Sequence, residues 1–148
     1  MIRSGPLVRE RVRWSDVDKM DVVYYARYVR FMEAAESEFF RELGFPYDRL
    51  SEGLGVWIAR VKLEVHFKAP ARLDDEVLCR AELVKIGGSS MTFAFPIDRA
   101  DGTRLADGGL VLAALDRHTM RATRLPEPLR AALQHGAPNQ ASSSASRP

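Results

Sequence analysis

The spacing of hydrophobic residues changes along the chain, and the change predicts which segments are helix and which are strand. Apolar and polar positions alternate from Leu7 to Trp14, which predicts a short strand with one buried face. From Ala26 to Leu43 apolar residues recur at helical spacing on one side, while Glu33 and Glu36 fall elsewhere, which predicts the one long helix. Gly44 follows as a natural stop. Four later stretches have the pattern of strands: residues 57–67, 77–86, 91–97 and 105–116.

The four strand-like stretches differ in what they predict about burial. The first, Trp57 to Phe67, alternates strictly, so we expect one face to meet the core and the other to meet solvent or a partner. Pro96 lacks an N–H group, which predicts an edge position or a bulge in its strand. The segment from Leu105 to Asp116 is apolar on both faces and is expected in the middle of the sheet. One strand, one long helix and then four strands predict an α+β domain without parallel βαβ units.

The length of 148 residues fits a single domain with one core. We expect this domain to cover residues 1–135, with a short helical turn over residues 129–133. Residues 136–148, GAPNQASSSASRP, contain no apolar residue larger than alanine. Such a segment buries too little surface to offset the entropy of ordering it, so a disordered, Ser-rich tail is expected there.

Composition and charge exclude several classes of protein. Hydrophobic residues make up 46% of the chain and charged residues 28%, which is typical of globular proteins. No apolar run approaches the roughly 18 residues of a membrane span, and the first residues lack a signal-peptide pattern, so we expect no membrane span and a cytoplasmic protein. The single cysteine and three scattered histidines predict neither a disulfide nor a metal site. A net charge of +2 gives no indication of a nucleic-acid partner.

Three aspartates, Asp16, Asp18 and Asp21, lie between the first strand and the long helix. Carboxylates at a helix entrance commonly cap its free N–H groups and complement its dipole. The apolar and aromatic run that follows directly, VVYYARY, suggests instead a pocket beside the acids. A carboxylate there would lie close to backbone N–H groups that can polarise a carbonyl, which is the arrangement of a hydrolytic site.

Other chemical motifs do not fit the sequence. A calcium loop needs oxygen ligands at alternate positions followed by a glycine. Position 20 is Met, which offers no oxygen ligand, and no glycine follows it. An aspartyl-phosphate nucleophile usually ends an apolar parallel strand, which is not expected here. The chain also lacks a phosphate-binding Gly-rich loop and a Gly-x-Ser-x-Gly elbow. Nucleotide hydrolysis and serine chemistry are therefore excluded.

A stretch of 32 residues begins at Trp14 and reads WSDVDKMDVVYYARYVRFMEAAESEFFRELGF. This stretch resembles the opening of a known enzyme family. The family is the 4-hydroxybenzoyl-CoA thioesterases, and the resemblance is strongest to their bacterial, Tol-Pal-associated acyl-CoA thioesterase branch. It extends through FKAPARLDDEV, GGSSMTFAF and RLADGGLVLAALDRHTMRATRLP, and so covers roughly Val8 to Leu133. The resemblance implies the hotdog fold, an antiparallel sheet wrapped around one long helix, and the order of elements predicted above agrees with it.

The resemblance implies a catalytic role for two positions. Asp18 corresponds to the second Asp of the family motif and would act on the thioester as nucleophile or as general base for water. Tyr25, seven residues later, would polarise the thioester carbonyl through its backbone N–H. The chain departs from the family pattern at two places, because Tyr25 stands where a His is common and Asp21 stands where the motif has Gly. Asp tolerates a positive φ better than most residues if the glycine position requires one.

The resemblance also implies how substrate is bound. In such enzymes the site lies between two subunits, so a homodimer with shared active sites is expected, and a homotetramer as a dimer of dimers. Neither a metal nor an organic cofactor is needed. We expect the acyl group near three residues of the VVYYARY run and the nucleotide end of CoA near basic and hydroxyl side chains. The candidates are Val23, Tyr24 and Tyr28 for the acyl group, and Arg60, Lys62, His66, Lys68, Ser89 and Ser90 for CoA.

The function predicted from the sequence is hydrolysis of an acyl-CoA or aryl-CoA thioester to the free acid and CoA. Two alternatives remain open at this point. The thiol carrier could be acyl carrier protein, or the chain could be a non-catalytic hotdog module that binds acyl-CoA. The presence of Asp18 argues against the second alternative.

Overall fold

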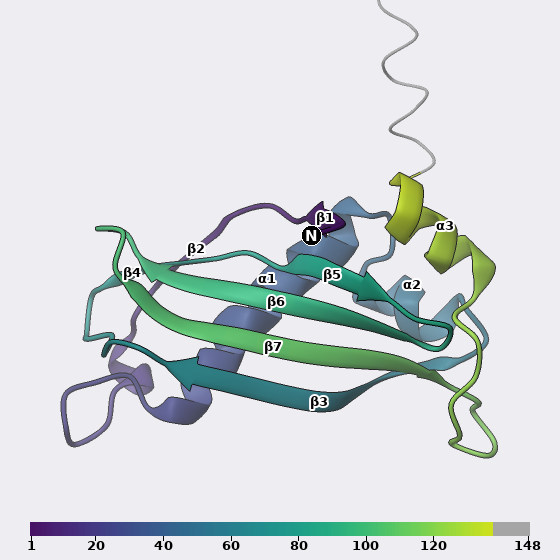
Figure 1. Cartoon of the computed structure of the whole chain (residues 1–148). Helices are drawn as coiled ribbons and strands as arrows, with labels where there is room; N and C mark the ends of the chain where they lie inside the picture. Colours follow the sequence, from purple (N-terminus) through teal and green to yellow (C-terminus); the bar gives the residue numbers. More distant parts are fainter. Residues whose placement is uncertain (138–148) are drawn as a thin grey trace, which may run out of the picture.

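The computed structural model describes residues 1–137, so residues 138–148 of the expected tail lie outside the described part. Within residues 1–137 the chain runs through seven strands, three α-helices and two 3-10 helices (Figure 1). In chain order these are β1 (Arg3–Ser4), β2 (Val8–Arg11), η1 (Trp14–Asp16), η2 (Tyr25–Arg27), α1 (Tyr28–Glu42), α2 (Tyr47–Glu52), β3 (Trp57–Phe67), β4 (Glu76–Cys79), β5 (Glu82–Ile86), β6 (Ser90–Arg99), β7 (Arg104–Leu115) and α3 (Glu127–His135).

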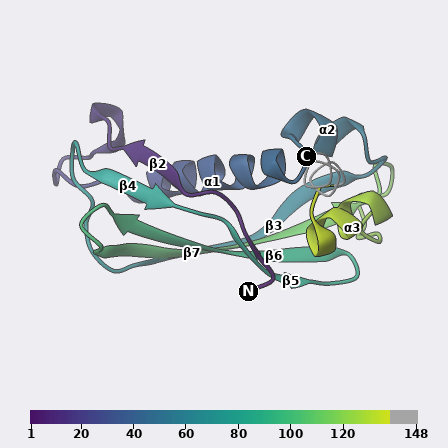
Figure 2. The same ribbon diagram turned by 90° about the horizontal axis from the view of Figure 1, so that it is seen from above.

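The strands form one antiparallel sheet, and α1 lies along one of its faces (Figure 2). In the order of pairing, β3 forms the edge and is followed by β7 and β6. The other side of β6 pairs with β5 at one end and with β4 at the other, and these pair in turn with β1 and β2. The predicted α+β architecture, an antiparallel sheet around one long helix, is confirmed.

The core lies between α1 and the sheet. Phe39 and Phe40 of α1 pack against Phe93 of β6, and these three residues are buried, as is Phe31. Close approach is possible because Gly108 on β7 has no side chain. A Cβ atom there would lie 2.8 Å from the Sδ atom of Met32. The predicted central position of the last strand is also confirmed, since β7 pairs with a strand on each side.

The second predicted strand, 77–86, is divided into β4 and β5. The division explains how Pro96 is accommodated inside the sheet. The β5 partners of β6 end at Ala94 and its β4 partners begin at Ile97, so Pro96 has no strand beside it on that side within residues 1–137. Pro96 is therefore in an edge-like position within an interior strand. The bulge in β6 lies one step further on, between Ile97 and Asp98.

The prediction for the first long strand was wrong about burial. β3 pairs only with β7 within residues 1–137, and Val61, Leu63 and Phe67 are each more than half exposed. The register shifts between Arg60 and Lys62, which makes Val61 the extra residue of a β-bulge. A bulge exchanges the two faces of the strand, because side chains alternate with a period of two. The apolar residues that pack against the core are thus Ile58 before the bulge and Val65 after it.

No helix within residues 1–137 has the length and apolar character needed to cross a bilayer.

Candidate active site

The loop between β2 and α1 holds Asp18 in a tight turn. The Asp18 N–H donates to the Val22 carbonyl over 3.0 Å, and the Asp18 carbonyl accepts from the Asp21 N–H over 3.0 Å. Oδ1 of Asp18 accepts from the Met20 N–H over 2.8 Å. Asp21 has a φ of 60°, so the position of the family's glycine does require the left-handed region, which Asp tolerates. Within residues 1–137 the second carboxylate oxygen of Asp18 has no hydrogen-bond partner, and the side chain is half-buried.

Asp16 has a different environment, although it is only two residues away. It is 1% exposed and accepts both Nε and Nη2 of Arg30, at 3.2 and 2.5 Å, and the Arg13 N–H at 2.8 Å. Burial raises the pKa of Asp16, but the hydrogen bonds from Arg30 and Arg13 outweigh it and hold the pKa below its usual value. The Asp16 carbonyl also accepts the Tyr24 N–H over 2.7 Å. Asp16 therefore ties α1 to the loop that carries Asp18.

The three aspartates thus do not act as one cluster. Asp16 is buried and paired, Asp18 is half-buried with one free oxygen, and Asp21 is exposed. None of them caps the long helix, because α1 begins without a side-chain cap. The interpretation that the cluster caps the long helix is therefore wrong, although the Asp16 side chain accepts the N–H of Arg13 at the start of η1.

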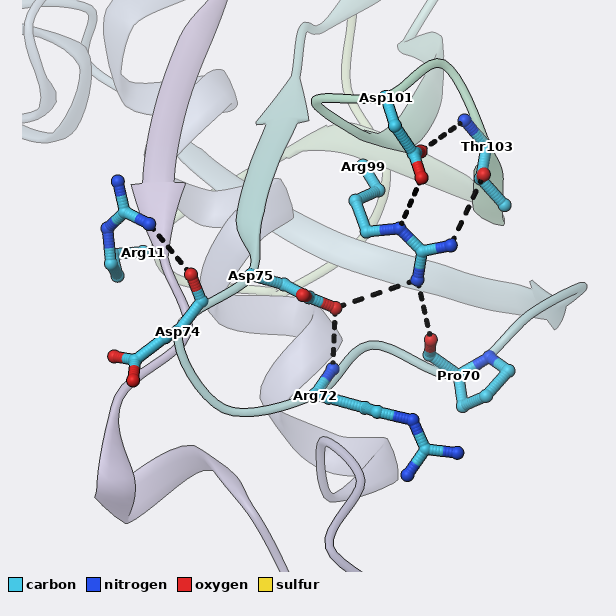
Figure 3. Close-up of polar contacts among 8 residues, drawn as sticks. All are labelled: Arg11, Pro70, Arg72, Asp74, Asp75, Arg99, Asp101 and Thr103. Atoms are coloured by element: carbon cyan, nitrogen blue, oxygen red, sulfur yellow. Dashed lines mark hydrogen bonds and ion pairs between the residues drawn. The ribbon is translucent and has the colours of Figure 1, made fainter.

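Arg72 and Leu73 line the pocket that contains Asp18, and the segment 70–75 around them is held by a polar network (Figure 3). Arg99 contacts the Asp75 carboxylate at 3.6 Å and donates to the Pro70 carbonyl at 3.4 Å. The Arg72 N–H donates to Asp75 over 2.9 Å, while its guanidinium extends away from this network in Figure 3. Arg72 and Asp18 line the same pocket of about 360 Å³, together with Trp14, Val17, Asp21 and Leu73. Arg72 was missed at the sequence level, although it lies in the APARLDD segment.

A second pocket of about 300 Å³ lies beside the start of α1. It gathers four of the predicted site residues and is lined by Val22, Val23, Tyr25, Tyr28, Phe67, Lys68, Ala69 and Pro70. Tyr25 is the first residue of η2, so its backbone N–H has no acceptor within the helical turn. Val23 and Tyr28 are buried, and Tyr28 packs edge-on against Phe67 at 5.1 Å between ring centroids.

Tyr24 lies next to this pocket and is partly exposed. Its ring stacks obliquely on Tyr25 at 4.6 Å between centroids. The neighbouring Tyr25 side chain raises the pKa of Tyr24, with a smaller contribution from the Asp18 carboxylate. Tyr24 therefore contacts the Tyr25 ring and is near enough to Asp18 to feel its charge. The structure brings together Asp18, Val23, Tyr24, Tyr25, Tyr28 and Lys68.

Five of the predicted CoA-binding residues lie away from Asp18 within one chain. Lys62 and His66 contact Glu64 at 2.7 and 3.2 Å on exposed β3, on the face turned away from α1. Ser89 and Ser90 lie in the β5–β6 turn at the opposite end of the sheet (Figure 1). Ser90 pairs with Ala113 and Phe67 with Ala106, seven positions along β7. At about 3.3 Å per residue this is a separation of roughly 23 Å.

Arg60 is the fifth of these residues. It was predicted on the outer polar face of its strand, and the bulge at Val61 explains why that prediction is wrong. Arg60 belongs to the side of β3 that faces α1, not to the outer polar face, and its guanidinium pairs with Glu36 of α1. Glu36 was expected outside the apolar side of the helix, but it is 2% exposed. The Tyr47 hydroxyl donates to the same Glu36 oxygen over 2.9 Å. This cluster lies in the wall of a third pocket, about 620 Å³ in volume, between α1, α2, β3 and β7.

Among residues 1–137, no three His, Cys, Asp or Glu side chains are grouped so that they could hold a metal ion. Burial raises the pKa of the Cys79 thiol to about 12, so this cysteine stays protonated and is not a nucleophile.

The geometry agrees with what the chain resembles. Residues 12–133 match the thioesterase-like superfamily. The chain is 33% identical over 117 residues to the acyl-CoA thioester hydrolase YbgC of Escherichia coli, covering 79% of this chain and 87% of that protein.

Two solved structures share the fold. A hypothetical protein from Thermus thermophilus has 33% identity and a TM-score of 0.77, with 86% of this chain and 95% of that chain covered. A 1,4-dihydroxy-2-naphthoyl-CoA thioesterase from Synechocystis has 17% identity and a TM-score of 0.81, with 88% of this chain and 96% of that chain covered. The fold is therefore the predicted hotdog fold. The chain belongs to the thioesterase-like superfamily, and it is an enzyme of the thioesterase class.

Proposed function

We propose that the protein hydrolyses acyl-CoA thioesters to the free acid and CoA, with Asp18 as the catalytic carboxylate. The observation that carries this proposal is the position of Asp18. It lines a pocket with one carboxylate oxygen that has no partner within residues 1–137, and a second pocket beside it is lined by the first residue of η2. The relative from E. coli is named as an acyl-CoA thioester hydrolase, which supports CoA as the thiol carrier.

Two steps follow from this arrangement. The Tyr25 N–H would donate to the thioester oxygen and stabilise the negative charge that develops on it. Asp18 would either attack the carbonyl carbon and form an anhydride that water opens, or take a proton from a water that attacks directly. In both routes the C–S bond breaks, one water is consumed, and the sulfur of CoA leaves with a proton.

Lys68 and Arg72 are the two cations we assign to the entrance of this site. Each lines one of the two pockets and is exposed. Exposed Lys and Arg suit the phosphates of CoA, because Arg presents a planar fork and Lys a compact charge. Of the residues predicted to bind CoA, Lys68 alone lines one of these two pockets within residues 1–137.

The substitution Asp18→Asn tests the catalytic assignment. It keeps the size of the side chain and removes the carboxylate, so we expect a loss of at least about a thousandfold in kcat, measured as thiol release from butyryl-CoA and benzoyl-CoA. Asp74→Asn is the matched control, since Asp74 is exposed and contributes through its backbone carbonyl. Turnover of Asp18→Asn near the wild-type rate would refute the assignment.

Heavy-oxygen water separates the two routes. In a single turnover with excess enzyme, label in the Asp18 carboxylate shows the nucleophilic route with water opening the anhydride at the Asp18 carbonyl, whereas the general-base route places the label only in the released acid. Mass spectrometry of the peptide that contains Asp18 reads the difference.

We also propose that two copies pair through β3. This edge strand leaves Val61, Leu63 and Phe67 more than half exposed within one chain, and its outer backbone groups have no strand beside them within residues 1–137. Such an edge favours pairing with another chain. Leu63→Arg should therefore shift the protein to a monomer in light scattering, whereas Val84→Arg on the exposed side of β5 should not. The same measurement distinguishes a dimer from the expected tetramer.

A further inference from the structure

The pocket between α1, α2, β3 and β7 lies beside the candidate active site but is not part of it. Val29 of α1 lines this pocket, and its neighbour Tyr28 lines the pocket that contains Tyr25. From β3, Leu63 lines the larger pocket and Phe67 lines the pocket that contains Tyr25, and both residues are about half exposed. An apolar strip of α1 and β3 side chains thus connects the two pockets. An acyl chain held at Tyr25 would reach the larger pocket along this strip.

At its end away from Tyr25, the larger pocket contains a polar group with which a purely apolar acyl chain could make no hydrogen bond. Glu36 is 2% exposed and its Oε1 accepts from Tyr47 and from Nη2 of Arg60. The Arg60 side chain is half exposed. Within residues 1–137 its other two nitrogens have no hydrogen-bond partner. Glu36 therefore anchors a guanidinium whose remaining N–H groups are free at the pocket wall.

The charges of the pocket favour a neutral partner for those N–H groups. Three carboxylates of the described residues line the pocket, those of Glu33, Glu36 and Asp48, against one guanidinium. The pocket is therefore unfavourable for another carboxylate, because like charges repel and Arg60 is already compensated. A methyl group at this place would strip water from the guanidinium without replacing its hydrogen bonds. A hydroxyl accepts from Arg60 and donates to a carboxylate, so it satisfies both kinds of group.

The distance along the helix sets the length of the acyl chain. Tyr28 and Glu36 are eight residues apart on α1, which is about 12 Å at 1.5 Å per residue. An extended chain advances about 1.2 Å per bond, so roughly ten bonds span this distance.

We propose that this pocket holds the far end of the acyl chain and that Arg60, anchored by Glu36, selects chains of about ten carbons that carry an uncharged hydroxyl at that end. The inference rests on the proposed thioesterase function for the position of the thioester. It adds a specificity-determining site that is distinct from Asp18 and Tyr25.

Binding tests the pocket without any need for turnover. The probes are CoA thioethers, which cannot be hydrolysed, with S-decyl, S-(ω-hydroxydecyl) and S-(ω-carboxynonyl) chains, measured by calorimetry with the full-length protein. We expect the hydroxylated probe to bind at least about tenfold more tightly than the methyl-ended probe, because one charge-assisted hydrogen bond is gained. The carboxylated probe should bind more weakly than the hydroxylated one. Equal affinity for the methyl and hydroxyl probes, or tightest binding of the carboxylate, overturns the proposal.

The double variant Glu36→Leu with Arg60→Leu identifies the residues responsible. It removes both members of the pair, so it leaves no charge buried alone. We expect the preference to reverse, with S-decyl-CoA bound more tightly than the hydroxylated probe. Lys85→Met is the matched control, because it removes an exposed cation on β5, far from the pocket, and it should keep the wild-type ratio. A double variant that keeps the wild-type ratio also overturns the proposal.

Hydrolysis of the corresponding thioesters separates this inference from the proposed function. If the protein hydrolyses decanoyl-CoA and ω-hydroxydecanoyl-CoA with equal kcat/KM, the pocket assignment fails and the thioesterase assignment stands. If no thioester is hydrolysed but the thioethers show the expected ratio, the thioesterase assignment fails and the pocket assignment stands as a binding site.

Discussion

Among residues 1–137, Asp16 and Glu36 are the two buried carboxylates, and both are paired with an arginine, yet their pKa values move in opposite directions. Asp16 receives donors on both oxygens, two from Arg30 and one from a backbone N–H. Glu36 receives Tyr47 and Arg60 on a single oxygen. Burial raises the pKa of Glu36 above its usual value, and its partners offset this only in part. For Asp16 the partners outweigh burial.

The comparison shows that depth of burial and number of donors together decide the role of a buried carboxylate. Both side chains are almost fully shielded from solvent, but burial acts more strongly on Glu36, which also has fewer donors. Asp16 is fully engaged, which makes it a rigid connection between α1 and the catalytic loop. Glu36 retains an oxygen without a partner within residues 1–137, and its arginine retains free N–H groups. One pair therefore holds structure, and the other is available to a ligand.

The largest expected effect is that of Asp16→Asn. The substitution breaks a buried ion pair and should lower the free energy of unfolding by about 3 kcal/mol, the low end for such pairs because Arg30 keeps Glu10 as a partner. It should also lower kcat, since a weaker bond to Arg30 loosens the loop whose Asp16 backbone carbonyl holds Tyr24 beside Tyr25. Urea denaturation and thiol-release kinetics measure the two effects. Glu10→Gln, which removes only the more exposed partner of Arg30, should cost less than about 1 kcal/mol. Equal losses for the two variants would contradict the role of Asp16.

Arg60→Leu should have a smaller effect, and the double variant a smaller one still. The single substitution leaves Glu36 with Tyr47 alone, and we expect a loss of about 1 to 2 kcal/mol because Glu36 can take up a proton instead. Glu36→Leu with Arg60→Leu should return to within about 1 kcal/mol of the wild type, since apolar pairs often replace buried ion pairs without loss. Thermal or urea unfolding of both proteins checks this order. A double variant that is less stable than Arg60→Leu would show that the pair stabilises the fold.

The smallest expected effect is the pH dependence of stability, which tests the opposite pKa shifts of Asp16 and Glu36. The pKa of Asp16 is lowered in the fold from 3.8, so its contribution is present above that pH and is lost as pH falls through the folded pKa. The pKa of Glu36 is raised from 4.5, so its contribution is present below that pH and is lost as pH rises through the folded pKa. The stability difference between wild type and Asp16→Asn should therefore grow with rising pH. The difference between wild type and Glu36→Gln should shrink. Slopes of the same sign would contradict the assigned directions.

Much of the fold was predictable because it depends on local periodicity. The long helix, the regular alternation of β3 and the doubly apolar β7 all carry strong patterns. The break between β4 and β5 was not predictable, because the strand pattern continues through Arg80 and Ala81. A change of partner along β6 makes the break, and such a change leaves no mark on the sequence of one strand.

The candidate site was predictable only where it is local. Asp18, Val23, Tyr25 and Tyr28 belong to one short stretch, and the structure keeps them together. Arg72 and Glu36 were missed because each meets its pocket through contacts with residues distant in the chain. Arg60 was placed on the wrong face because strict alternation hides a bulge.

The bulge at Val61 has a further consequence for how this protein can change. Arg60 and Lys62 already pair with consecutive residues of β7, so deletion of Val61 would restore an unbroken pleat and leave Arg60 facing Glu36. The bulge changes only which sequence positions face α1: Ile58 and Arg60 are even-numbered, whereas Leu63 and Val65 beyond it are odd-numbered. One residue can therefore be gained or lost at this point of the strand without any change in the side chains that line the pocket. Relatives with and without this residue should be compared by register before they are compared by sequence.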